Sequence, residues 1–320
     1  MRHPAACLQL SLAIFRQARK GRAVFRSTWF LIISFVFLWN SGFIGAQFSL
    51  SYAGPLTQLF WRYLALTLLL LLGLGLSRKF VWPGPAPVVI QSIVGILAHA
   101  AWLGSCLIAI QGGVDVGIVA LVVSLQPLMT GALSGCVTGE TTSARIWLGL
   151  LIGFAGVVMT VGLRIQSGPP GSGIYYLFPL IAAFCMTAAT LFQRRLELMH
   201  LRTTLPLWPS LFYQAAASAM VLFPLAWFFE GLDTEWTLEF AGGLAWLIIA
   251  VSLGAYSVMW TLIKRIDATR VASLFYLGPP VTMLMAWLAF GDVLHTADIA
   301  GLLLVLVGVG LAQEKRATNI

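Results

Sequence analysis

A segment near the middle of the chain is repeated near its end, 152 residues later and without a gap. Of 43 aligned positions, 12 are identical. They include Pro127 and Pro279, each inside an apolar stretch, and the turn that follows keeps its acidic residue, with Glu140 matching Asp292. A repeat of this kind means that the fold contains the same structural unit twice.

The unit is built from membrane-spanning segments. Only 9% of the residues are charged and 59% are hydrophobic, whereas soluble proteins have about 25% and 45–50%. A spanning helix needs about 20 mostly apolar residues. Stretches that qualify lie at about 28–46, 56–76, 86–110, 116–138, 145–163, 173–193, 206–229, 240–263, 270–291 and 296–313. We predict an all-α integral membrane protein with ten transmembrane helices in one bundle.

The number of spans in each repeat determines how the repeats are related. Each repeat holds five spans, an odd number, so the second must enter the membrane from the opposite side. The prediction is therefore two inverted five-helix repeats, at residues 28–164 and 173–313, with a short tail at 314–320.

Positive charge predicts which side faces the cytoplasm. With the N-terminus inside, 17 of the 19 basic residues fall on the inner side; Arg164 lies outside and Arg62 within the second span. Basic residues accumulate in cytoplasmic loops, so we expect both termini in the cytoplasm. The net charge of +8 then serves topology and contact with an anionic lipid bilayer, and we expect no nucleic-acid partner.

Residues 1–27 form a basic leader without acidic residues. Its apolar run is too short to span a membrane, so a transit peptide or an interfacial amphipathic segment are two interpretations. A simple extension without a structural role is the favoured one.

The fifth and tenth spans contain few polar residues and many glycines. Small residues let helix backbones approach closely, so these spans are expected to be peripheral scaffold or the contact of a homodimer. The glycines concerned are Gly149, Gly153, Gly156, Gly301, Gly308 and Gly310.

Several short patterns at matching spacing make residues 28–313 resemble the drug/metabolite transporter superfamily, and within it the EamA-type carriers. They are the run Phe37–Phe43, Phe60-Trp61-Arg62, Ala120–Pro127, Gly139-Glu140, Ala255-Tyr256, Trp260, Asp267–Arg270, Pro279 and Gly291-Asp292. The resemblance implies ten helices, two inverted domains, cytoplasmic termini and transport of amino acids, nucleosides, other metabolites or drugs, many of them outward. Two residues depart from the pattern: Asn40 stands where a small residue is usual, and Gly104 stands where the other repeat has Tyr256.

The polar and aromatic side chains of the other spans are expected to line a cavity that binds the substrate, although aromatic residues in bundles are more often core. The candidates are Trp39, Asn40, Trp102, Ser124, Gln126, Tyr256, Trp260, Phe275 and Tyr276. His99, in the middle of the third span, joins them because ionisable residues inside membranes are costly and usually functional. Cavity lining is the expectation for His99, and proton coupling is the alternative.

A second group of residues is expected to move. Pro127 and the run Gly278-Pro279-Pro280 interrupt equivalent helices, because proline removes a helical hydrogen bond. They are predicted hinges, with simple packing kinks as the alternative. Arg62 is either a structural arginine, which snorkels or is bound to the backbone, or a gate or a contact for an anionic substrate.

These features favour a secondary transporter of the bacterial inner membrane, in the exporting direction, that moves small metabolites such as amino acids by alternating access. A non-transporting scaffold or receptor is the alternative, and a membrane-embedded enzyme is disfavoured because the motifs of zinc, serine, nucleotide and aspartyl chemistry are missing. We predict no catalytic residue, metal or cofactor. Proton antiport through His99 and uniport both stay open.

Overall fold

The computed structural model describes residues 28–78, 82–139, 143–167, 172–199, 205–266, 271 and 274–312. The leader, the tail, Glu140 and Asp267 lie outside these ranges. Within them every regular element is helical, apart from an isolated bridge between Ala53 and Thr234. The all-α prediction is confirmed.

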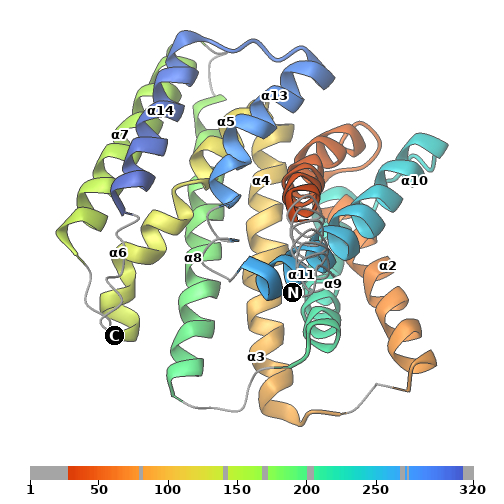
Figure 1. Ribbon diagram of the computed structural model, residues 1–320. Helices are drawn as coiled ribbons and strands as arrows, with labels where there is room; N and C mark the ends of the chain where they lie inside the picture. Colours follow the sequence, from red (N-terminus) through yellow and green to blue (C-terminus); the bar gives the residue numbers. More distant parts are fainter. Residues whose placement is uncertain are drawn as a thin grey trace, which may run out of the picture.

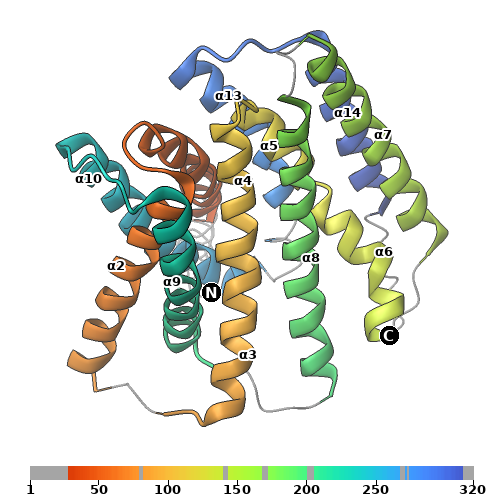
Figure 2. The ribbon, with the colours of Figure 1, turned by 180° about the vertical axis from the view of Figure 1, so that it is seen from behind.

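The helices follow the predicted spans closely (Figures 1 and 2). In chain order the passes are Thr28–Ser49; α2 (Pro55–Leu76); α3 (Pro85–Gly95), η1 (Ile96–Ala101) and α4 (Trp102–Gln111); α5 (Val116–Val123) and α6 (Gln126–Thr138); α7 (Ala144–Ser167); η2 (Ser172–Tyr176) and α8 (Leu177–Leu198); α9 (Leu207–Glu230); α10 (Leu238–Ala245), η3 (Trp246–Ala255) and α11 (Tyr256–Ile266); η4 (Phe275–Leu277) and α13 (Gly278–Phe290); and α14 (Thr296–Ala312). Among the described residues, eight passes are long and apolar enough to cross a membrane, and the last two are shorter apolar helices.

The repeat is visible in the backbone. Helices α9, α13 and α14 each begin 152 residues after α2, α6 and α7. Gly139 and Gly291 end α6 and α13 with φ of 74° and 73°, a left-handed conformation that glycine adopts without a Cβ clash. The π-helical segments η1 and η3 also overlap under the same shift. Both repeats therefore share helix starts, caps and irregularities.

Equivalent helices run in opposite directions, as inverted repeats require. Gly156 of α7 faces Gly301 near the start of α14, and Gly149 near the start of α7 faces Gly308. Likewise the start of α2 meets the end of α9, where Glu230 accepts the backbone N–H groups of Leu56 and Thr57 at 3.0 and 2.7 Å. Figures 1 and 2 show α7 and α14 side by side at one edge of the bundle.

The glycines of α7 and α14 are used inside the chain. A Cβ added to Gly156 would lie 2.8 Å from the Gly301 carbonyl oxygen, and one added to Gly308 would lie 2.4 Å from the Gly149 carbonyl oxygen. The close approach that we expected for these residues thus joins the two repeats. A homodimer through these helices stays a prediction, and it would have to use their outer faces, where Leu151, Phe154, Val158, Leu303 and Val307 are exposed.

The main core lies between the repeats. Leu59, Tyr63, Leu107, Leu121 and Leu247 are each at most 2% exposed and belong to one cluster of buried apolar side chains. Large apolar side chains also cover the outside of the bundle. Such an exposed apolar surface suits contact with lipid tails rather than with water.

Candidate functional site

A cavity of about 430 Å³, which we call the central chamber, lies between the two repeats. Its walls come from the first helix, α4, α5, α6, α8, η4 and α13. Of the predicted substrate-binding and hinge residues it contains Trp39, Asn40, Trp102, Ser124, Gln126, Pro127, Phe275, Tyr276, Gly278 and Pro279. Predicted residues from several different helices therefore line one cavity.

Proline creates the breaks that open this chamber. Pro127 and Pro279 lie in the first turns of α6 and α13, where a missing N–H costs nothing because no helical partner exists there. Before them, α5 ends at Val123 and η4 forms a single tighter turn. Each proline thus starts a new helix and does not bend a continuous one. Whether these breaks act as hinges remains a prediction.

Trp39 forms the aromatic wall of the chamber. Its ring centroid lies 4.9 Å from that of Phe275, edge to face, and 5.5 Å from that of Tyr256. Such offset and edge-on arrangements are the favourable ones for aromatic pairs. The first helix is thereby held against η3–α11 and η4.

Asn40, which departs from the residue usual at its position in the EamA-type carriers, links the first helix to α13. Its side-chain nitrogen donates to the carbonyl of Val36 at 2.7 Å, and its side-chain oxygen accepts from the Thr282 hydroxyl at 3.1 Å. The residue is 3% exposed. Because a buried amide must be paired, these bonds give Asn40 a structural part in the chamber wall.

Gln126 supplies the polar part of the opposite wall. Its side-chain nitrogen donates to the Thr130 hydroxyl at 3.1 Å, and its backbone carbonyl accepts from the hydroxyls of Thr130 and Thr187 at 2.9 and 3.3 Å. Ser124 donates to the Leu121 carbonyl at the end of α5. These hydroxyls satisfy backbone and amide groups at the start of α6.

A smaller cavity of about 40 Å³ adjoins the chamber, and we call it the basic recess. Trp39, Phe43 and Trp102 line both spaces. The recess also contains the predicted residues Arg62, His99 and Tyr256. The chamber and the recess thus share a wall of three aromatic side chains.

Arg62 points into the recess and is only 6% exposed. Its Nη2 donates to the Ser252 hydroxyl at 3.0 Å, and its Cζ lies 5.7 Å from the centre of the Tyr63 ring. An arginine that snorkelled would reach the surface of the bundle, and this one does not.

His99 belongs to a chain of side-chain hydrogen bonds. Its Nε2 lies 3.1 Å from the Gln214 side-chain oxygen, and the Gln214 nitrogen donates to the Gln91 side-chain oxygen at 2.7 Å. The Gln214 oxygen can only accept, so this contact is a hydrogen bond when the imidazole carries its proton on Nε2. Gln214 is the repeat equivalent of Arg62, 152 residues on.

Trp260 and Pro280 are the two predicted residues that line neither cavity. Trp260 is 41% exposed. It follows Tyr256 by four residues, and this step carries a side chain roughly 40° past a full turn of an α-helix. The prediction that Trp260 encloses the ligand is not supported by its position on the outer side of α11.

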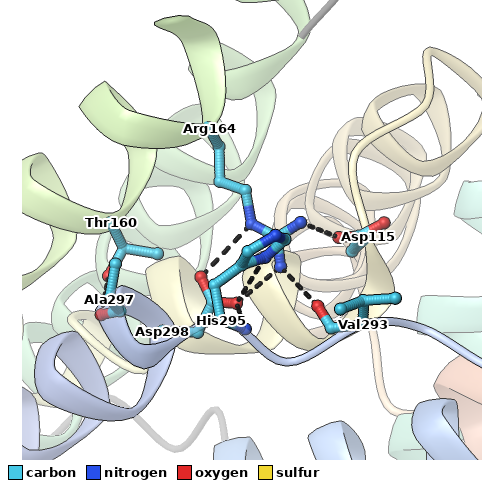
Figure 3. A network of polar contacts seen from close by, with 7 residues as sticks. All are labelled: Asp115, Thr160, Arg164, Val293, His295, Ala297 and Asp298. Carbon is cyan, nitrogen blue, oxygen red and sulfur yellow. Dashed lines mark hydrogen bonds and ion pairs between the residues drawn. The ribbon is translucent and has the colours of Figure 1, made fainter. Parts of the chain in front are cut away.

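A charged cluster that the sequence analysis did not identify lies at the end of the bundle that is predicted to be outside (Figure 3). Arg164 contacts Asp115 through Nη1 at 2.9 Å, Asp298 through Nε at 3.2 Å, and the Val293 carbonyl through Nη2 at 2.9 Å. Asp298 is fully buried and also accepts the His295 backbone N–H at 2.8 Å. We call Asp115, Arg164 and Asp298 the ion cluster.

The ion cluster joins the beginnings and ends of helices from both repeats. Asp115 precedes α5, Arg164 lies near the end of α7 and Asp298 lies in the first turn of α14. Burial raises the pKa of Asp115, and the Arg164 guanidinium opposes this rise. The adjoining crevice holds only about 10 Å³, so little free space lies beside the cluster.

A signal for this cluster was present in the sequence. Arg164 was the one basic residue placed outside, and two of the acids lay at the starts of spans predicted to begin outside. Among the described residues, no group of three or more His, Cys, Asp or Glu side chains could hold a metal ion.

Comparison with known proteins gives the family. The model of the EamA-like transporter family matches residues 26–162 and again residues 173–312. The chain is 26% identical to "Uncharacterized inner membrane transporter YedA" of Escherichia coli (strain K12), covering 86% of both chains. It is 24% identical to "Uncharacterized transporter YvbV" of Bacillus subtilis (strain 168), covering 89% of this chain and 91% of the relative.

A further relative, the "Probable amino-acid metabolite efflux pump" of Salmonella typhimurium, is 23% identical, covering 89% of this chain and 94% of its own length. A crystal structure of another protein superposes with a TM-score of 0.60 at 21% identity, over 90% of this chain and 96% of the other; it supports the fold. With its duplicated bundle and its two matches to one family model, the chain belongs to the EamA-like transporter family and is a multi-pass membrane transporter.

Proposed function

We propose that this protein is a secondary transporter that exports small metabolites, such as amino acids, across the bacterial inner membrane by alternating access. The observation that carries the proposal is the chamber of about 430 Å³ between the inverted repeats. It falls within the usual size range of small-molecule sites, which are mostly apolar with a few polar groups. Substrate sites of inverted-repeat transporters lie at such an interface.

The substrate class is supported by one relative, which is named an amino-acid metabolite efflux pump. Another is named an inner membrane transporter, and the charge bias favours cytoplasmic termini. The names of the family and of the relatives point to transport rather than to enzymatic chemistry.

The movement is supported by where the breaks and the ion cluster lie. The start of α6 and the start of α13 are chamber walls, so a change at either break would reshape the chamber. The ion cluster ties α5, α7 and α14 together at the predicted outer end. Release to the outside would require its contacts to separate while one repeat rocks against the other.

The test is efflux from liposomes that contain the purified protein and a panel of labelled amino acids. We expect efflux above that of protein-free liposomes, and loss of most of it in Trp39→Ala, because Trp39 lines both cavities. Trp260→Ala is the matched control, since this tryptophan lines neither cavity, and its efflux should equal that of the wild type. Equal efflux from Trp39→Ala and the wild type would remove the chamber from the transport path.

A further inference from the structure

The basic recess contains a buried positive charge without a negative partner. No carboxylate of the described residues forms an ion pair with Arg62. Its hydrogen bond goes to the neutral hydroxyl of Ser252, and that hydroxyl in turn donates a hydrogen bond to the Leu247 carbonyl at 3.0 Å. Charge buried in this way is costly unless something pairs with it.

Two hydrogen-bond donors in the recess are also unused. The Nε of Arg62 and the indole Nε1 of Trp102 are buried and have no partner among the described residues. Both side chains line the recess. Because buried donors are nearly always paired in folded proteins, each one left over needs an explanation, and together they favour a ligand that accepts hydrogen bonds.

His99 does not balance the charge. Its Nε2 faces the Gln214 side-chain oxygen, and a second positive charge beside Arg62 would be strongly unfavourable in a membrane interior. With a neutral His99, the side chains of the recess sum to one positive charge.

The size and connection of the recess fit one end of a small molecule. Its 40 Å³ holds about three water-sized volumes by the usual measure, which is enough for a carboxylate but not for a whole metabolite. The chamber beyond Trp39, Phe43 and Trp102 has room for the remainder.

We propose that the basic recess binds the carboxylate of the transported solute, with Arg62 and Trp102 as its donors and the apolar part of the solute in the central chamber. The proposal rests on the proposed function and makes it more specific, because it assigns a monoanionic carboxylate group to the substrate. A carboxylate accepts two or more hydrogen bonds and pairs with a guanidinium through short, charge-assisted bonds.

The experiment measures equilibrium binding of three probes to the purified protein by calorimetry in detergent. Phenylacetate, phenylacetamide and phenethylamine share a ring but carry an anionic, a neutral and a cationic end. We expect wild-type protein to bind phenylacetate about tenfold or more tightly than phenylacetamide, since hydrogen bonds to a charged group are stronger than those between neutral groups. Arg62→Gln, which installs the residue found at the equivalent position of the other repeat, should abolish this preference.

Two further variants keep the proposal testable if the Arg62→Gln protein does not fold. Trp102→Phe keeps an aromatic ring but loses the N–H, so it should weaken the binding of phenylacetate more than that of phenylacetamide and thereby lower the preference. Lys264→Gln removes a positive charge that is exposed near the end of α11 and should leave the preference intact.

Equal binding of phenylacetate and phenylacetamide to the wild type, no binding of phenylacetate, or a preference that survives in both Arg62→Gln and Trp102→Phe would overturn the proposal. Liposome efflux separates the two proposals. If no amino acid is exported yet phenylacetate is preferred, the proposed function fails alone; if export occurs without that preference, only the carboxylate site fails.

Discussion

Two arginines of the described residues lie among the helices of the bundle, Arg62 buried and Arg164 partly exposed, and their surroundings differ. Arg164 meets two carboxylates and a backbone carbonyl at the predicted outer end. Arg62, deeper in the bundle, meets one hydroxyl and the face of one ring. The first has its charge neutralised by the protein itself, whereas the second leaves a positive charge and a donor for something else.

The two arginines are therefore expected to have different roles, Arg164 in stability and Arg62 in ligand binding. A fully paired guanidinium can hold helices together but has nothing left to offer a ligand. An incompletely paired one contributes little to stability and is ready to bind. Removing Arg164 should therefore affect mainly folding, and removing Arg62 mainly ligand binding.

The largest effect is expected from Arg164→Met. It leaves the fully buried Asp298 without its cation, and breaking one side of a buried ion pair typically costs about 3–5 kcal/mol. Thermal unfolding in detergent should show a clear drop in the melting temperature.

Adding Asp298→Asn to Arg164→Met provides the control. The double variant no longer buries a charge, so it should recover part of the lost stability. If it melts below the single variant, the loss came from packing and not from an unpaired carboxylate.

A smaller effect is expected from Gly301→Ala, which tests whether the ion cluster depends on the close approach of α7 and α14. The added Cβ would lie 2.9 Å from the Gly156 carbonyl oxygen and would also meet the Thr160 hydroxyl. Overpacking of this kind costs about 1–3 kcal/mol. Gly310→Ala, where a Cβ meets nothing within 4 Å, is the matched control and should melt like the wild type.

Asp115→Asn should cost less, about 1 kcal/mol or below, because partly exposed ion pairs contribute little. Asp115 keeps 35% of its side chain exposed, against 0% for Asp298. The same melting experiment should place it between Gly310→Ala and Gly301→Ala. A loss equal to that of Arg164→Met would show that both acids share the pairing equally.

The smallest effect on stability is expected from Arg62→Gln. Replacing a buried charge that lacks a carboxylate partner removes an unfavourable burial along with a single hydrogen bond to Ser252, so the melting temperature should not fall. A drop as large as that of Arg164→Met would mean that Arg62 is structural, and the comparison between the two arginines would not hold.

The sequence predicted the spans and the repeat well because both depend on apolar length and on spacing along the chain. It also placed most of the chamber residues, since proline breaks and polar residues in spans are visible without a structure. It could not place the partners of those residues. The contact of Arg164 with Asp298 crosses 134 positions, and the contact of Arg62 with Ser252 crosses 190, so both depend on how the helices pack.

The direction in which a side chain points was the other property that the sequence could not predict. Tyr256 lines the recess and Trp260 does not, although both belong to one short helix. The four-residue step between them turns a side chain roughly 40° past a full turn of an α-helix, and which of the two directions faces a cavity depends on how α11 packs against its neighbours.

The proline breaks have an electrical consequence for the chamber. Gln126 and Gly278 are the first residues of α6 and α13, and both line the chamber. A helix carries roughly half a positive charge at its N-terminus, so two such ends meet the same space. Because α5 ends at Val123, which also lines the chamber, a negative helix end meets the same space, and the potential inside is set partly by the backbone even after every basic side chain has been replaced.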